Sequence, residues 1–232
     1  MYHGDLIDYM PEGFELDNFK LTWQMTRVER LAFLDILNRI KPNLALEVGT
    51  DKGGSLEAIM RHSMSAISID INSHNQKILS ELDCFKDVQF VSGNSAQLLP
   101  ELIDAFNANS MHPDFILIDG DHGTSGALRD INSILEIQPL KPICVVMHDS
   151  FMPSVRRAIL NANWSNNPFV HYVEVDYAYG SFIPLVESPL NLKMVGGLAM
   201  ALLKPAKRTF DLPIFESNKH AFDELLKIAC NN

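Results

Sequence analysis

The sequence predicts an α/β fold: a Rossmann-like, doubly wound, mostly parallel seven-stranded sheet with an antiparallel edge hairpin and helices on both faces. One observation behind this prediction is that five short apolar runs alternate with amphipathic helical segments between residues 26 and 150. Such alternation is typical of parallel strands covered by crossover helices. The other is that two strand-like runs follow residue 150 with no clear helix between them. We expect these two runs to form an antiparallel hairpin that closes one edge of the sheet.

A helix over residues 26–40 is expected before the first strand. Apolar residues from Phe33 to Ile40 fall at i, i+3, i+4 and i+7, which places them on one helical face. Thr26 fits the N-cap, and Glu29 completes the pattern of a capping box. A Lys-Pro pair then ends the helix.

The later elements follow from the same periodicities. The predicted strands are residues 44–48, 66–71, 88–93, 113–121, 143–149, 170–177 and 196–205. Helices are expected in the gaps between the first five strands and over residues 153–163 and 220–229. We therefore divide the chain into an N-terminal arm or cap (1–25), an α/β domain (26–205) and a C-terminal tail with a helix (206–232).

The formal net charge of −10 argues against two classes of partner. Sequence-independent nucleic-acid binding needs a basic surface, and an anionic membrane would repel an acidic chain. No apolar run reaches the length of a membrane span, the first residues lack the pattern of a signal peptide, and the three cysteines are far apart. We expect a cytoplasmic protein with reduced thiols that binds neither nucleic acid nor membrane. A non-core arm and an otherwise exposed hairpin edge favour a homodimer.

Acidic residues gather where the predicted strands end. In open parallel sheets, ligands bind beyond the carboxyl ends of the strands. Four of the five parallel strands carry acids there, which are Glu47, Asp70, Asp119 with Asp121, and Asp149. Clustered like charges repel one another, so we expect a ligand with cationic or hydroxyl groups at this edge.

The turn after the first strand is rich in glycine. Its pattern is G-x-x-x-G-G (Gly49, Gly53, Gly54), which lacks the second glycine of the dinucleotide fingerprint. Glu47 ahead of the turn would repel a pyrophosphate but suits an ammonium group. Asp70 ends the second strand, where Rossmann-like folds bind a ribose diol. Asn72 or Ser73 is the better cap for the following helix, which leaves Asp70 free for a ligand.

Five ordered motifs carry a family resemblance: LEVGTDKGGS, SIDIN, VQFVSGNSAQLLPEL, ILIDGDHG and VVMHDS. Together they resemble the class I S-adenosylmethionine-dependent methyltransferases over residues 26–150. Within that class the chain is similar to the catechol-type O-methyltransferases, and more so to the macrocin O-methyltransferase and cephalosporin-hydroxylase-like group.

The resemblance implies a set of cofactor contacts. Ser55 would bind the methionine carboxylate with help from the helix N-terminus, Asp70 the ribose hydroxyls and Ser95 the adenine edge. Glu47 and Gly49 would lie along the methionine and ribose, and Asp119 beside the sulfonium. The complete implied set is Glu47, Gly49, Thr50, Gly53, Ser55, Asp70, Ile71, Asn94, Ser95, Asp119, Asp121 and His122.

The resemblance also implies a metal site and a base. In catechol-type enzymes an acid and an Asp-Asn pair hold a divalent ion, and the matching residues here are Asp119, Asp149 and Ser150, for which Mg²⁺ is the expected ion. A serine hydroxyl is a poorer ligand than an amide oxygen, and His148, Asp121 or His122 could compensate. The alternative is that Asp119 serves only the cofactor and Asp149 caps a helix. For the catalytic base we expect His122, with Asp121 as the runner-up.

These observations predict an S-adenosylmethionine-dependent O-methyltransferase. The acceptor would be a hydroxyl of a small molecule, such as a natural product or a sugar, and Mg²⁺ would assist. A catalytically silent S-adenosylmethionine-binding module is the alternative, but a mere binder has no need of the acid and histidine cluster. A nicotinamide dehydrogenase would require the G-x-G-x-x-G pattern that the chain lacks.

Overall fold

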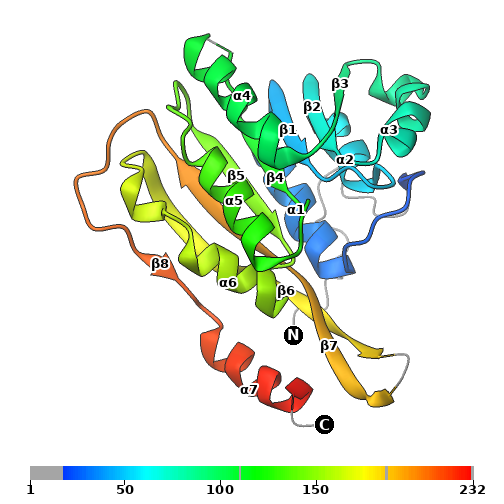
Figure 1. The fold of residues 1–232 in the computed structure, drawn as a ribbon, viewed down its shortest axis with the longest axis vertical. Helices are drawn as coiled ribbons and strands as arrows, with labels where there is room; N and C mark the ends of the chain where they lie inside the picture. The colour runs from blue at the N-terminus through cyan, green and yellow to red at the C-terminus, as the bar shows by residue number, and fades with distance from the viewer. Residues whose placement is uncertain (1–17, 110, 186–187, 231–232) are drawn as a thin grey trace, which may run out of the picture.

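An eight-stranded sheet forms the centre of the protein (Figure 1). The computed structural model describes residues 18–109, 111–185 and 188–230. The strands are β1 Leu44–Val48, β2 Ser65–Asp70, β3 Val88–Ser92, β4 Phe115–Ile118, β5 Ile143–His148, β6 Val170–Leu185, β7 Ser188–Leu203 and β8 Ile214–Phe215. The helices are α1 Arg27–Ile40, α2 Gly54–His62, α3 Ser73–Ser80, α4 Ser95–Ala108, α5 Thr124–Ile134, α6 Pro153–Asn161 and α7 Lys219–Cys230, with 3₁₀ turns at Asp83–Phe85 and Trp164–Asn166.

The strand order is β3-β2-β1-β4-β5-β7-β6-β8. β1 pairs in parallel with both β2 and β4, so the order reverses between β1 and β4. Ligands bind at such a switch point in doubly wound folds. The predicted fold class is confirmed.

Helices cover both faces of the sheet, because each inner strand is apolar on both sides. In β1, Leu46 and Val48 pack into the core with α4, α5 and α6, whereas Ala45 packs with α1, α2 and α3. The capping box predicted for α1 is present: the Thr26 side chain accepts from the Glu29 N–H, and the Glu29 side chain accepts from the Thr26 N–H. The described helices include none long and apolar enough to cross a membrane.

The antiparallel edge is longer than the sequence indicated. β7 runs antiparallel to β5 and to β6, and two-residue β8 then pairs in parallel with β6. This eighth strand was missed because two residues carry no periodicity. The division of the chain at residues 25 and 205 stays a prediction, and most of the predicted arm lies outside the described residues.

The C-terminal helix α7 packs beside the long hairpin (Figure 1). Phe222 of α7 contacts Phe151 edge to face, with ring centroids 5.5 Å apart. The buried Arg156 guanidinium lies over the Phe222 ring and pairs with Asp176 and Glu216. The helix is therefore tied to the segment that directly follows β5.

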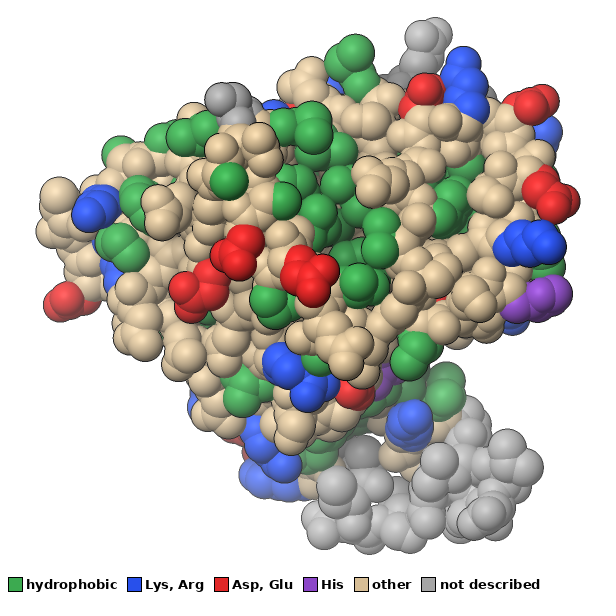
Figure 2. Space-filling model, turned by 45° about the horizontal axis from the view of Figure 1, so that its top comes forward, with side chains coloured by type: hydrophobic (Ala, Val, Ile, Leu, Met, Phe, Trp, Pro, Cys, Tyr) green, Lys and Arg blue, Asp and Glu red, His purple; other side chains and the backbone are tan. Residues whose placement is uncertain are grey.

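Charged side chains are mixed over the visible surface. Among the described residues in Figure 2, Lys and Arg side chains are scattered and form no continuous basic stripe on that face.

Two strand ends come into close contact at the switch point. The N–H of Gly49 donates to Ile69, and the N–H of Asp119 donates to Val48, both at 2.8 Å. Gly49 has a φ of +95°, and a Cβ on it would lie 2.0 Å from the carbonyl oxygen of Asp119. This position therefore requires glycine both for its backbone conformation and for space.

We expect Gly49→Ala to lower the free energy of unfolding by about 2–4 kcal/mol, because strain and steric overlap add. Gly120→Ala is the matched control, since its Cβ would meet Val48 at 3.2 Å without a positive φ. That variant should lose about 1 kcal/mol or less. Urea unfolding followed by circular dichroism measures both, and equal losses would contradict the argument.

Candidate active site

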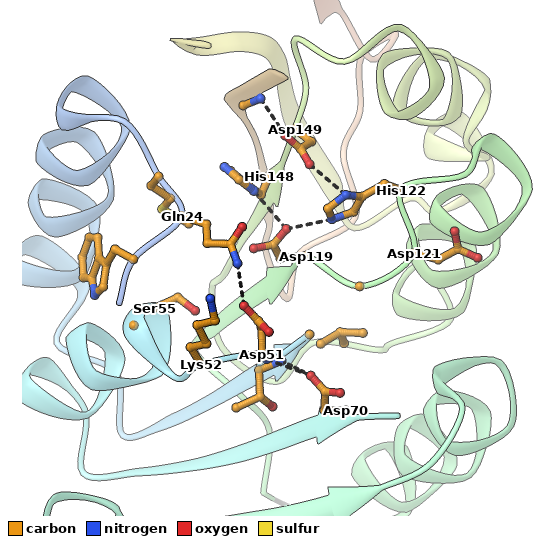
Figure 3. Close-up of a pocket in the computed structure, with 18 of the residues that line it drawn as sticks. Gln24, Asp51, Lys52, Ser55, Asp70, Asp119, Asp121, His122, His148 and Asp149 are labelled. Atoms are coloured by element: carbon orange, nitrogen blue, oxygen red, sulfur yellow. Dashed lines mark hydrogen bonds and ion pairs between the residues drawn. The ribbon is translucent and has the colours of Figure 1, made fainter. Parts of the chain in front are cut away.

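A cavity of about 880 Å³ lies over the carboxyl ends of β1, β2, β4 and β5. The loop after β1, the first turn of α2, and the ends of β2, β3 and β4 form one part of its wall. Residues 22–26, Glu29, the end of β5 and the β6–β7 hairpin form the other part. Figure 3 shows side chains from both parts converging on this cavity.

Asp70 fixes the glycine-rich loop to the end of β2. Its carboxylate accepts the backbone N–H groups of Thr50 at 2.7 Å, Asp51 at 2.9 Å and Asn72 at 2.6 Å. The side chain of Asn72, one of the two cap candidates in the sequence, caps α3. Asp70 lines the cavity, so its remaining lone pairs can accept from a ligand hydroxyl.

Glu47 lies behind the cavity wall, whereas the sequence predicted that it would lie along the ligand. Strand alternation turns it toward α2, and its carboxyl group is fully buried. It accepts the hydroxyls of Ser55 at 2.7 Å and Ser68 at 2.8 Å. Burial raises the pKa of Glu47 to about 8, against the opposing effect of these two hydroxyls. The Glu47 carboxyl group, uncharged at neutral pH, holds Ser55 and so orients the loop. Direct pairing of Glu47 with an ammonium group of the ligand, which the sequence predicted, does not fit this position.

The first turn of α2 opens onto the cavity. Its N-cap is Gly53, with a φ of +80° and no side-chain cap. The indole of Trp23 lies so close to Gly54 that a Cβ there would be 2.2 Å from its Cδ1 atom. The Trp23 indole N–H is buried and has no partner among the described residues. An uncapped helix N-terminus and this spare donor together suit a ligand carboxylate.

The segment after β3 closes the other end of this wall. The Asn94 side chain accepts from the Ala96 N–H and caps α4. The Ser95 hydroxyl donates to both carboxylate oxygens of Asp130, at 2.9 and 3.0 Å. Ile71 is largely exposed at the cavity rim. The Ser95 oxygen can therefore accept from a ligand, but its proton is already donated.

Asp119, Asp149, His122 and His148 meet beyond the ends of β4 and β5 (Figure 3), and Glu29 reaches His148 from α1. His148 Nδ1 lies 2.9 Å from Asp119 Oδ1, and His148 Nε2 lies 3.0 Å from Glu29 Oε1. His122 Nε2 lies 3.5 Å from Asp119, and its Nδ1 lies 3.2 Å from Asp149. We call these five residues the acid–histidine cluster.

The charges of the cluster support one another. Burial would raise the pKa of Asp119, but the two histidines outweigh it and hold that pKa at about 2. Burial would lower the pKa of His148, but Asp119 and Glu29 raise it well above the usual value. The hydrogen bond to Asp119 raises the pKa of His122, with a further contribution from the charge of Asp149.

Two of the three expected Mg²⁺ ligands, Asp119 and Asp149, come together, but Ser150 does not join them. Ser150 is buried against Gly197 and does not line the cavity, because the chain turns at Asp149 with a left-handed φ of +59°. One Asp149 oxygen accepts the Gly196 N–H at 2.6 Å. Among the described residues, the group with ligand atoms within 4.8 Å of one another is Asp119, His122 and Asp149. His122 thus stands where Ser150 was expected and brings a nitrogen where Mg²⁺ prefers oxygen, so the Mg²⁺ site stays a prediction and we route no step through Mg²⁺.

Asp121 is turned away from the cluster in Figure 3. Its carboxylate accepts the Gly123 N–H at 2.7 Å and shapes the turn before α5. This orientation leaves His122, and not Asp121, facing Asp119 and Asp149.

Sequence reasoning assigned no direct role in the site to Glu29 and only an auxiliary one to His148. One signal was available: β5 alternates, and His148 shares the strand face of Cys144 and Val146, which packs with α1.

The far end of the cavity has an apolar wall. Met25, Met152, Ile183 and Val195 line it, with Lys193 beside them. Tyr172 and Phe182 are not among the lining residues: Tyr172 contacts Phe215, and Phe182 contacts Phe151.

Comparison with known proteins identifies the central part of this fold. Residues 46–151 match a family described as a methyltransferase domain. This match shows a methyltransferase domain over residues 46–151. The match ends one residue after Ser150, so the whole switch point of this methyltransferase domain lies inside it. No curated protein matches the chain in sequence.

Solved structures share the fold at low sequence identity. A putative O-methyltransferase from Klebsiella pneumoniae is 15% identical with a TM-score of 0.54, and the match covers 88% of this chain and 92% of that one. An O-methyltransferase from Bacillus cereus, in complex with S-adenosylhomocysteine, is 14% identical with a TM-score of 0.52 over 74% and 79% of the two chains. TomG from Streptomyces achromogenes, an O-methyltransferase of tomaymycin synthesis in complex with S-adenosylmethionine, is 14% identical with a TM-score of 0.51 over 75% and 78%. The predicted resemblance to the class I methyltransferases is confirmed.

The buried Glu47 carboxyl makes stability depend on pH. Its pKa is 4.5 in the unfolded chain and about 8 in the folded protein. Its contribution to the free energy of unfolding is therefore full below pH 4.5 and is lost as the pH rises through about 8. Glu47→Gln cannot ionise, and we expect its melting temperature to fall less than that of the wild type between about pH 5 and 9. Thermal unfolding across this range measures the effect. Glu101→Gln, at an exposed position, is the control and should follow the wild type; a Glu47→Gln curve parallel to it would contradict the burial argument.

Proposed function

We propose that this methyltransferase transfers the S-adenosylmethionine methyl group to a hydroxyl group of a small molecule, such as a natural product or a sugar. The observation that carries this proposal is the acid–histidine cluster at the junction of the two parts of the cavity. One part carries the features of a cofactor site, and the other has an apolar wall with room for a second molecule. A silent binding module would need only the first part.

The cofactor side fits S-adenosylmethionine by its chemistry. When bound, the cofactor supplies a methyl group on a positively charged sulfur. The uncapped N-terminus of α2 would hold its carboxylate, and Asp70 its ribose hydroxyls. Asp119, whose pKa of about 2 keeps it ionised, would face its positive charge.

His122 is the proposed base. Its side chain is half-exposed to the cavity, and its Nε2 makes the looser of its two carboxylate contacts. In this proposal Nε2 accepts the proton of the acceptor hydroxyl while the new O–CH₃ bond forms and the S–CH₃ bond breaks. Asp149 would then stabilise the imidazolium that results.

The cofactor assignment makes a selective binding prediction. Calorimetry should detect binding of S-adenosylhomocysteine but not of NAD. Asp70→Asn should weaken that binding by about 1–3 kcal/mol, the usual result of leaving polar groups without partners. Asp104→Asn, at an exposed position on α4, should leave it unchanged. Tighter binding of NAD than of S-adenosylhomocysteine would end this assignment.

The raised pKa of His122 predicts the pH dependence of turnover. A base must be unprotonated, so the rising limb of the pH–rate profile should lie above the ordinary histidine pKa of 6.5. Asp149→Asn removes one carboxylate charge that raises this pKa and should move the limb to lower pH. Formation of S-adenosylhomocysteine with an acceptor found by screening hydroxyl compounds measures the profile. A limb that survives unchanged in His122→Gln would assign the base to another group.

A further inference from the structure

We propose that Lys193 binds a carboxylate group of the acceptor, and that the acceptor is therefore a hydroxy acid with an apolar body between its two polar ends. The inference deepens the proposed function and rests on it. It assigns a specificity-determining role to a residue of β7, a strand that lies outside the matched family region of residues 46–151.

Strand alternation turns Lys193 toward the cavity. In the β6–β7 hairpin, Lys193 is the partner of Ile183, and Met194 is the partner of Phe182. Residues opposite one another in an antiparallel pair share a face of the sheet, and successive pairs alternate between the two faces. Ile183, Lys193 and Val195 line the cavity, whereas Phe182 and Met194 belong to the apolar cluster that packs with α7 on the other face. The direction of Lys193 is therefore set by the packing of its neighbours.

The strand that carries Lys193 is fixed to the reactive end of the cavity. The Gly196 N–H donates to Asp149 at 2.6 Å, and the Gly196 carbonyl accepts the Phe151 N–H at 2.8 Å. Lys193 precedes Gly196 by three positions, which is about 10 Å along a strand. A molecule that reaches from the acid–histidine cluster to Lys193 therefore needs a body of roughly this length between its two polar ends.

Lys193 is a cation without a counter-charge on an otherwise apolar wall. Lys141, Lys219 and Lys227 each pair with a carboxylate, but Lys193 pairs with none of the described ones. Its neighbours on the wall are the apolar side chains named above. A ligand that fills this part of the cavity displaces water from the ammonium group, which costs free energy unless the ligand supplies a hydrogen-bond acceptor. A negatively charged acceptor compensates this loss best.

The other lysine and arginine side chains of the cavity lie on the cofactor side. Lys52 belongs to the glycine-rich loop after β1. Arg129 lies on α5 next to Asp130, which accepts from Ser95. Among the described lysines and arginines that line the cavity, Lys193 is therefore the one that an acceptor on the apolar wall meets.

The distribution of charge also orients the acceptor. Lys193 attracts a carboxylate to the hairpin end of the wall, while the acids of the cluster disfavour it at the reactive end. The hydroxyl group then faces His122, as the proposed function requires. One ammonium group matches one negative charge, so we assign a carboxylate and not a dianionic phosphate.

Pairs of acceptors that differ only in charge test the inference. Each pair is a hydroxyaryl or hydroxyalkyl carboxylic acid and its primary amide, such as para-hydroxyphenylpropanoate and para-hydroxyphenylpropanamide, supplied with S-adenosylmethionine. Formation of S-adenosylhomocysteine measures turnover. In each pair that is methylated, we expect the acid to have a KM lower than that of the amide by about fivefold or more, the effect of one charge-assisted hydrogen bond.

Amides that are methylated as well as their acids would overturn the inference. A phosphate monoester of similar length that is preferred over the acid would overturn the choice of a carboxylate. Turnover of neither acids nor amides would instead count against the proposed function itself, so the two failures are distinguishable.

Lys193→Gln removes the charge and keeps much of the length of the side chain. We expect the KM for the acid to rise about fivefold and kcat to stay within about twofold, because the ion pair is present equally in the bound substrate and in the transition state. Lys193→Arg should keep the preference for acids. Lys204→Gln is the matched control, because Lys204 directly follows β7 but does not line the cavity, and it should behave as the wild type.

Reversal of the charge completes the test. Lys193→Glu should lose the preference for acids and favour the amine counterpart of the same acceptor, para-hydroxyphenylpropylamine, over the acid. A preference for acids that survives in Lys193→Gln and in Lys193→Glu would overturn the role of Lys193.

Discussion

Where β1 and β4 end side by side, the backbones of Gly49 and Asp119 approach so closely that only a hydrogen atom fits between them. This approach sets the geometry of the rest of the site. It brings the loop that Asp70 fixes and the carboxylate of Asp119 to one edge of the sheet. A cofactor that bridges these two strand ends can then touch acids from both. The constraint is one of sterics, and it is met at the position where the strand order reverses.

The second constraint is the balance of charge. Acids gathered at one sheet edge destabilise a fold unless a ligand, a metal or protein cations oppose them. In this protein, the pKa of Asp119 is low and that of His148 is high for the same reason, because each holds the other in its charged form. His122 has the same kind of relationship with Asp119 and Asp149 but remains open to the cavity. The two histidines of the cluster therefore differ in their surroundings: His148 is buried, whereas His122 is open to the cavity.

The N-terminal segment takes part in the site from outside the matched family region. Trp23 lies beside the N-terminus of α2, and Glu29 reaches His148 from the first turn of α1. Glu29 serves both the helix cap and the cluster, so the start of α1 and the end of β5 are held in register.

The sequence by itself determined the order of the elements, because periodicity, capping and glycine placement are local properties. The strand β1 has the predicted bounds, the capping box of Thr26 and Glu29 forms, and Asn72 caps α3. It also determined that Asp70, Asp119 and Asp149 reach the ligand edge, since parallel strands align their carboxyl ends. Only the tertiary structure decided where those side chains turn. It placed Glu47 behind the wall and Ser150 against the hairpin, and it joined Glu29 to His148 across 119 positions of the chain. Pairings between distant elements depend on how helices pack on the sheet, and no local pattern encodes that distance.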